Sequence, residues 1–155
     1  MPVELTQVTV VATPIAAVGG WAPRNGLGQA IVSRLDKVYA VLRARQVTGL
    51  GHNVVVYKAA AGAPADVRLL IEVGVQTPEP ISPEGEVIAS ATPAGRAATV
   101  AHVGPYDGIP ATGDAAIAQM DAMGLKRASV SWEVYGDWEE DPARLRTDLY
   151  WLLAD

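Results

Sequence analysis

The chain has no cysteine, and its 155 residues include only two histidines, His52 and His102. Without cysteine it can form neither a disulfide framework nor a thiolate nucleophile, and two histidines cannot build a histidine-rich metal site on their own. The sequence therefore excludes most thiol chemistry and predicts no metal site and no cofactor.

Charged residues are scarce, at 19% of the chain, and 17 acidic residues against 12 basic ones give a net charge of -5. This balance argues against a broad phosphate-binding surface, so we expect no direct nucleic acid binding, whereas a cationic partner is compatible with it. No apolar run approaches the roughly 18 residues that cross a membrane, and no signal pattern opens the chain. We expect a single cytoplasmic domain over residues 1–155, without membrane association.

Phenylalanine is absent, so all nine aromatic side chains are Trp or Tyr, and each carries a polar atom that needs a partner when buried. Large rings usually fill a core, and we expect Trp132 and Trp138 to be packing residues. As a group, however, the rings near the C-terminus suggest the wall of a cavity. Five of the nine lie in the last 24 residues: Trp132, Tyr135, Trp138, Tyr150 and Trp151.

Alternating apolar residues predict strands, and apolar residues that recur every three or four positions predict helices. The proline-rich stretch at 77–85 is interpreted as a connector between two halves. The first half is predicted to hold a strand at 4–18 that bends at Pro14, a helix from Leu27 to Leu42 that ends by Gly49, and a hairpin of strands 54–57 and 67–75 with its turn at 61–64. The second half is predicted to hold an extended stretch at 87–103 broken at 93–95, a helix at 115–123 capped by Gly124, and strands at 131–135 and 147–153.

Short internal matches indicate that the two halves are copies of one unit. Ala12-Thr13-Pro14 recurs 79 positions later as Ala91-Thr92-Pro93, and Val54-Val55-Val56-Tyr57 has its counterpart 78 positions later in Trp132-Glu133-Val134-Tyr135. The sequence thus predicts an α+β fold, a duplicated βαββ with pseudo-symmetric halves at about 4–75 and 86–154. We expect an antiparallel sheet with helices on one side and a central ligand groove, where the halves meet, on the concave opposite side.

Glu133 is the strongest candidate for a functional residue. Strand alternation places it on one face with Ser131 and Tyr135, and its first-half counterpart is the apolar Val55. A carboxylate on a central strand is unfavourable when it is buried without a partner, which favours a functional role. In the alternative interpretation, Glu133 pairs with an arginine such as Arg146 or accepts hydrogen bonds from tyrosine hydroxyls.

Two further aromatic residues are predicted to approach the groove. Gly104 and Pro105 form a turn after the predicted strand that can tip the Tyr106 ring toward the sheet, and Trp21 is placed at the matching junction of the first half. His102, just before this turn, is expected to be a strand histidine with its hydrogen bonds satisfied rather than a catalyst.

Five short motifs occur in order along the chain. They are Ile71-Glu72-Val73-Gly74-Val75, Thr92-Pro93-Ala94-Gly95, His102-Val103-Gly104-Pro105-Tyr106, Trp132-Glu133-Val134-Tyr135-Gly136, and Asp141-Pro142 with Arg146-Thr147-Asp148-Leu149-Tyr150. Together they resemble the GyrI-like small-molecule-binding domain of the SOUL/gyrase-inhibitor superfamily, which is also the AraC effector-binding domain family. The resemblance implies that Glu133 lies in an aromatic cage that complements cationic, planar drugs, with Tyr106, Tyr135, Tyr150 and Trp21 as the ligand-binding rings.

The resemblance leaves three functions open. The first is a standalone protein that binds hydrophobic, often cationic aromatic compounds. The second is a hydrolase that opens cyclopropane rings of genotoxic natural products, in which Glu133 acts as general acid or base and Tyr150 orients the ring. The third is the modulation of a protein partner such as gyrase.

Overall fold

The computed structural model describes residues 3–58 and 68–154. The hairpin turn predicted at 61–64 lies outside the described residues. Within them, no helix is long and apolar enough to cross a membrane.

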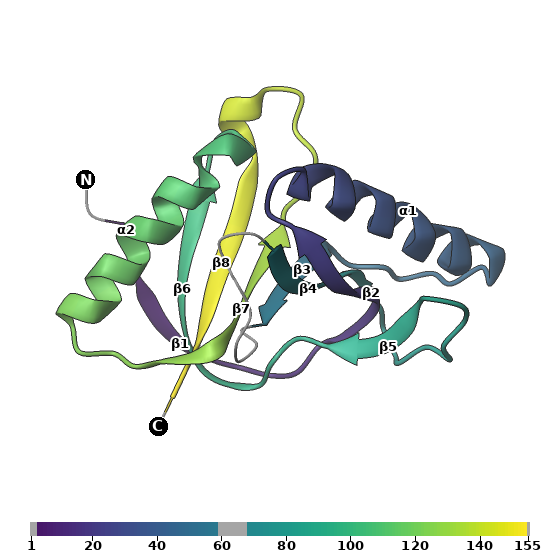
Figure 1. Cartoon of the computed structure of the whole chain (residues 1–155), viewed down its shortest axis with the longest axis horizontal. Helices are drawn as coiled ribbons and strands as arrows, with labels where there is room; N and C mark the ends of the chain where they lie inside the picture. Colours follow the sequence, from purple (N-terminus) through teal and green to yellow (C-terminus); the bar gives the residue numbers. More distant parts are fainter. Residues whose placement is uncertain (1–2, 59–67, 155) are drawn as a thin grey trace.

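Eight strands in the described part form one fully antiparallel sheet, and two α-helices pack on it (Figure 1). The strand order is β1-β6-β8-β7-β3-β4-β2-β5. This order confirms the predicted α+β class, with the strands β3 and β7 of the two halves paired at the centre. The elements are β1 (Thr6–Val10), β2 (Pro14–Pro23), α1 (Leu27–Ala44), β3 (Asn53–Lys58), β4 (Arg68–Gln76), β5 (Ile88–Ala91), β6 (Gly95–Val103), the short helix η1 (Tyr106–Gly108), α2 (Ile109–Ala122), β7 (Arg127–Tyr135), η2 (Pro142–Arg144) and β8 (Arg146–Leu153).

The predicted strand at 4–18 is in fact two strands that pair with different halves of the sheet. β1 pairs with β6, whereas β2 pairs with β4 and β5. The chain changes partners just before Pro14, which has no N–H to donate. There Thr13 N donates to Thr92 Oγ1 at 3.1 Å, and Thr92 N donates to the Thr13 carbonyl at 2.9 Å, so two residues at equivalent positions of the repeat hold each other.

α1 follows its sequence pattern at both ends, whereas α2 follows its pattern only at the C-terminal end. α1 buries Val38 and Leu42 of the predicted stripe, and it ends before Gln46, whose φ of 54° lies in the left-handed region. α2 ends near Gly124 as predicted but begins six residues earlier than expected, at Ile109. Its proline, Pro110, is the second helical residue. N–H groups in the first turn of a helix have no intrahelical acceptor, so a proline there costs no hydrogen bond.

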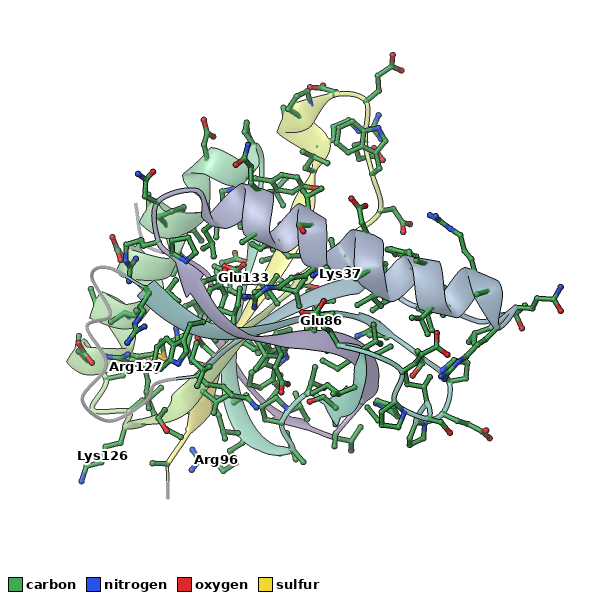
Figure 2. All side chains as sticks on the ribbon, turned by 45° about the vertical axis from the view of Figure 1, so that its right-hand side comes forward. Lys37, Glu86, Arg96, Lys126, Arg127 and Glu133 are labelled. Carbon is green, nitrogen blue, oxygen red and sulfur yellow. The ribbon has the colours of Figure 1, made fainter. Side chains whose placement is uncertain are left out.

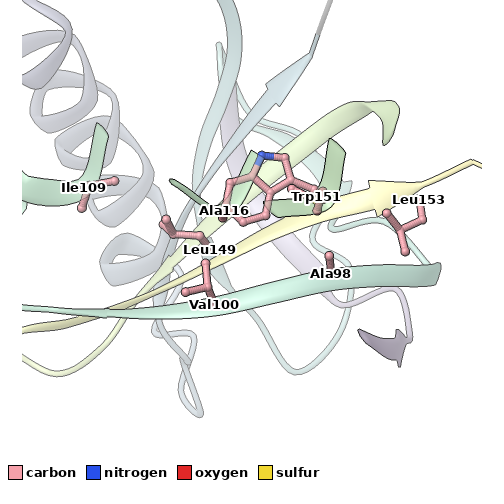
Figure 3. Packing of buried hydrophobic residues seen from close by; sticks show 8 residues of the cluster. Ala98, Val100, Ile109, Ala116, Leu149, Trp151 and Leu153 are labelled. Carbon is pink, nitrogen blue, oxygen red and sulfur yellow. The ribbon is translucent and has the colours of Figure 1, made fainter. Parts of the chain in front are cut away.

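Both helices cover the same face of the sheet. α1 packs on Val18 and Val75. α2 packs through Ile109, Ala116 and Met120 on residues of β6 and β8, including Trp151 (Figure 3). The other face holds its own buried cluster around Ile15, Val56 and Trp132. The two helices lie apart over the two ends of the sheet, so neither covers the central strands completely (Figure 1).

Candidate functional site

A cavity of about 510 Å³ opens on the helix-bearing face, over the central strands β3 and β7. The first turns of α1 form one wall, and η1 with the start of α2 forms another. This position corrects the expectation from the sequence, which placed the groove on the face opposite the helices; that face carries a separate apolar cluster. The lining residues are Leu27, Gly28, Ile31, Val32, Leu35, Asn53, Tyr57, Tyr106, Ile109, Pro110, Glu133, Tyr135, Gly136 and Trp138.

Glu133 contributes the one charged side chain among the described residues of this lining, and Figure 2 shows it in the middle of the molecule. Its Oε1 accepts hydrogen bonds from the hydroxyls of Tyr57, at 2.9 Å, and Tyr135, at 2.7 Å. The strand register places Glu133 directly opposite Val55, its counterpart in the repeat. Tyr57 and Tyr135 are likewise counterparts in the predicted repeat, so the Glu133 carboxylate receives one donor from each predicted half.

The environment of Glu133 favours its neutral form more than water does. Burial raises the pKa of the Glu133 carboxyl above its usual range, and the hydrogen bonds from Tyr135 and Tyr57 oppose that rise. Burial and the nearby carboxylate also raise the pKa of the Tyr57 and Tyr135 hydroxyls, so both stay protonated and donate. Among the described residues, both of these donors bind Oε1, which leaves Oε2 available to a ligand.

The mouth of the cavity carries exposed apolar side chains from three different elements. Tyr106 in η1 meets Tyr135 edge to face, with ring centroids 5.6 Å apart. Val32 on α1 and Trp138 in the loop after β7 also line the cavity, and Trp138 is 74% exposed. Trp138 is therefore not the packing residue that the sequence suggested, whereas Trp132 is buried as expected.

His102 supports the segment that carries Tyr106. Its Nε2 lies 2.8 Å from the Pro105 carbonyl, which can only accept, so Nε2 carries the proton and Nδ1 accepts from the Thr112 hydroxyl at 2.7 Å. His102 is thus the satisfied strand histidine that the sequence predicted. In the part of the chain that the structure describes, no three His, Asp or Glu side chains cluster as metal ligands would.

The structure brings Glu133, Tyr106 and Tyr135 together but leaves two of the predicted ligand-binding rings elsewhere. Tyr150 pairs in register with Trp132 and stacks on it at 5.0 Å, on the opposite face of the sheet from Glu133. Trp21 lies within β2 rather than at a strand-to-helix junction, and the Arg68 guanidinium stacks over its ring. The alternative partner Arg146 hydrogen-bonds Asp148 instead, so Glu133 has tyrosine partners.

Of the four aromatic residues in the described lining of the cavity, sequence reasoning missed two, Tyr57 and Trp138. The place of Tyr57 could have been predicted, because the internal repeat matches it to Tyr135. The place of Trp138 could not, since Trp138 lies in an irregular loop between the end of β7 and η2, where the sequence has no periodicity.

An apolar, ring-rimmed cavity with one carboxylate at its floor, set on an antiparallel α+β sheet, defines a domain that binds small molecules. The chain belongs to the GyrI-like family, described as the GyrI-like small molecule binding domain, whose model matches residues 55–154. No curated protein sequence matches the chain.

Solved structures share the fold over almost the whole chain. The EcmrR C-terminal domain matches with a TM-score of 0.76 at 17% identity, covering 100% of this chain and 99% of that one. In an EcmrR–DNA complex the TM-score is 0.78 at 16% identity; the match covers 98% of this chain but 57% of the EcmrR chain. SAV2435 bound to tetraphenylphosphonium has a TM-score of 0.66 at 10% identity, covering 99% and 94%. A hydrolase from Listeria innocua has a TM-score of 0.65 at 13% identity, covering 99% and 93%.

Proposed function

We propose that this protein binds hydrophobic aromatic cations in the cavity over β3 and β7. The observation that carries the proposal is the Glu133 carboxylate, which is held at the cavity floor by two tyrosine hydroxyls and faces otherwise apolar walls. A carboxylate in such surroundings is poorly solvated, so a cation that enters with its own apolar surface replaces the missing solvation.

The rings and the size of the cavity fit the same class of ligand. Tyr106, Tyr135 and Trp138 offer ring faces, and a cation over such a face gains about 0.5–2 kcal/mol. The volume of about 510 Å³ lies within the range of small-molecule sites. Tetraphenylphosphonium, the ligand in the SAV2435 structure, is an aromatic cation of this kind and is the natural first probe.

The test compares tetraphenylphosphonium with tetraphenylborate, an anion of nearly the same shape, by isothermal titration calorimetry. We expect the cation to bind and the anion not to bind. Glu133→Gln should weaken the cation at least about tenfold, because it removes the charge with little change of volume. Glu86→Gln makes the same change at an exposed position paired with Lys37 and should leave the affinity unchanged. Equal affinity for both ions, or equal losses in the two variants, contradicts the proposal.

One observation supports hydrolysis as a second candidate function. A carboxyl group that lines a cavity and whose pKa is raised by burial suits a general acid or base. Tyr57 and Tyr135, rather than Tyr150, would then orient the substrate. Incubation with a cyclopropane-bearing alkylating agent, read by mass spectrometry, distinguishes the two functions: a binder leaves the substrate mass unchanged, whereas a hydrolase adds water and loses that activity in Glu133→Gln.

Cytoplasmic location and a protein partner such as gyrase stay predictions.

A further inference from the structure

A second hollow, of about 300 Å³, lies at the other end of the central strands and has the opposite charge. Lys58, Arg68 and Arg127 line it, and none of its described lining residues is acidic. The whole chain has a net charge of -5, so three of its 12 basic residues around one small hollow form a local reversal of sign. Figure 2 shows Arg127 well to one side of Glu133.

A stacked pair gives this hollow a flat wall. The Arg68 guanidinium carbon lies 4.7 Å from the centroid of the Trp21 ring, and Trp21 is 41% exposed. Arg34 of α1 fixes the backbone beneath the ring, since its guanidinium donates to the carbonyls of Gly20, at 3.1 Å, and Trp21, at 2.8 Å. A planar ligand can therefore stack here on a prepositioned surface.

A break in the sheet lies in the same lining. The pairing of β7 with β8 shifts register between Arg127 and Ser131, and the residues between them line the hollow. A bulge of this kind removes backbone from the regular ladder and often lies beside a binding site. Ser129 and Ser131 add hydroxyl groups that can donate to an anion.

The positive charges of the hollow are only partly compensated. Lys58 forms an ion pair with Glu72 at 3.0 Å, whereas the Arg127 guanidinium lies 3.9 Å from Asp121, at the limit of an ion pair. Arg68 has no ion pair with another described residue. We propose that this hollow binds a planar aromatic anion, with the ring against Trp21 and a carboxylate or phosphate group against Arg68 and Arg127. The hollow adjoins the Glu133 cavity, since Tyr57 lines both, but its charged groups are Lys58, Arg68 and Arg127, and the inference does not depend on the proposed function of that cavity.

The experiment titrates 2-naphthoate, 2-naphthyl phosphate and the neutral 2-naphthamide into the full chain by isothermal titration calorimetry. We expect saturable binding of one or both anions and at least about fivefold weaker binding of the amide. The tighter anion identifies the preferred head group. Arg127→Gln should weaken the anions at least about fivefold, while the affinity for the amide stays unchanged. Arg68→Gln also alters the wall stacked on Trp21, so it should weaken the anions at least about fivefold and the amide less.

Arg96→Gln is the matched control, because Arg96 is exposed on β6, bonds to Gln7 and lies outside the hollow. Glu133→Gln removes a negative charge and should not weaken anion binding, so a failure of the Glu133 proposal cannot be mistaken for a failure of this one. Amide binding as tight as anion binding, no saturable anion binding, or an equal loss in Arg96→Gln overturns the inference. Because the exchanged arginines are at the surface, unchanged circular dichroism spectra verify that the variants fold.

Discussion

Val55 and Glu133 occupy equivalent positions of the two halves and lie directly opposite each other in the central strand pair. Val55 is 1% exposed and packs with Ile71 and Val73 under α1, as a central strand residue ordinarily does. Glu133 lies beside the gap between the helices and requires two tyrosine hydroxyls to satisfy one of its oxygens. The comparison teaches that the sheet accommodates an apolar residue at this position, so strand pairing alone does not explain the Glu133 carboxylate.

The largest effect is expected when the comparison is broken at Val55. Val55→Glu puts a second carboxylate into the central strand pair, opposite Glu133 and without a donor of its own. An uncompensated buried charge costs about 3–5 kcal/mol, a large part of the stability of a typical domain. We expect urea denaturation to show a stability loss of that size or an unfolded protein.

The control is Val11→Glu, the same substitution at a valine that is 78% exposed. It should change the free energy of unfolding by less than about 0.5 kcal/mol. A Val55→Glu protein as stable as this control would show that Val55 and Glu133 do not differ in the way that their burial indicates.

The second prediction sharpens the comparison through pH, since only Glu133 titrates. A permanent cation binds the ionised carboxylate, and burial raises the pKa of Glu133. The affinity for tetraphenylphosphonium should therefore rise with pH, by up to about tenfold per pH unit below that pKa, and level off above it. Titration calorimetry over a pH series measures this. Glu133→Gln should give a flat profile, and a flat profile in the unaltered protein would contradict the assignment.

Much of the fold was readable from the sequence, because it rests on local patterns. The apolar stripe of α1, the strands of both halves and the Glu133–Tyr135 alternation each depend on neighbours within a few positions. The sequence did not predict that β1 pairs with β6 of the second half and β5 with β2 of the first half. The pattern of an extended segment does not show which strand it pairs with.

The candidate site was only partly predictable for the same reason. The structure places Tyr106 and Tyr135 in the lining of the Glu133 cavity, whereas Tyr150 lies on the other face, because its face depends on the register between β7 and β8. A shift of one residue moves a side chain to the other face of a sheet. The exposed ring of Trp138 depends on the path of an irregular loop, which no periodicity encodes.

The third prediction compares the two faces of the central strands through tyrosine hydroxyls. Tyr57→Phe and Tyr135→Phe each remove one hydrogen-bond donor to Glu133 Oε1. The ionised carboxylate is then less stable relative to the neutral carboxyl, so the pKa of Glu133 rises further. We expect each variant to bind tetraphenylphosphonium more weakly at pH values near the pKa of Glu133, because a larger fraction of the carboxyl is then protonated, and we expect this loss to disappear well above that pKa. The pH profile of binding should shift upward in both.

Tyr150→Phe is the control, because its ring lies on the opposite face against Trp132. Its affinity and pH profile should match those of the unaltered protein. If Tyr150→Phe lost as much affinity as Tyr135→Phe, the ligand would have to occupy the other face, and the cavity assignment would be wrong.

The smallest effect, and the one most specific to the comparison, concerns stability without ligand. Because the folded-state pKa of Glu133 is raised, its stabilising contribution is complete below the unfolded pKa and is lost as pH rises through the folded one. At neutral pH the ionised group therefore destabilises the fold. Glu133→Gln keeps an acceptor for Tyr57 and Tyr135 without the charge, so its melting temperature at pH 7 should exceed that of the unaltered protein by about 2 °C or more. The difference should shrink as the pH falls toward 4, where the carboxyl is neutral. Thermal melts of both proteins across this range measure it. A variant that is less stable at pH 7 would mean that the carboxylate belongs to the packing of the sheet, as Val55 does, and not to the cavity.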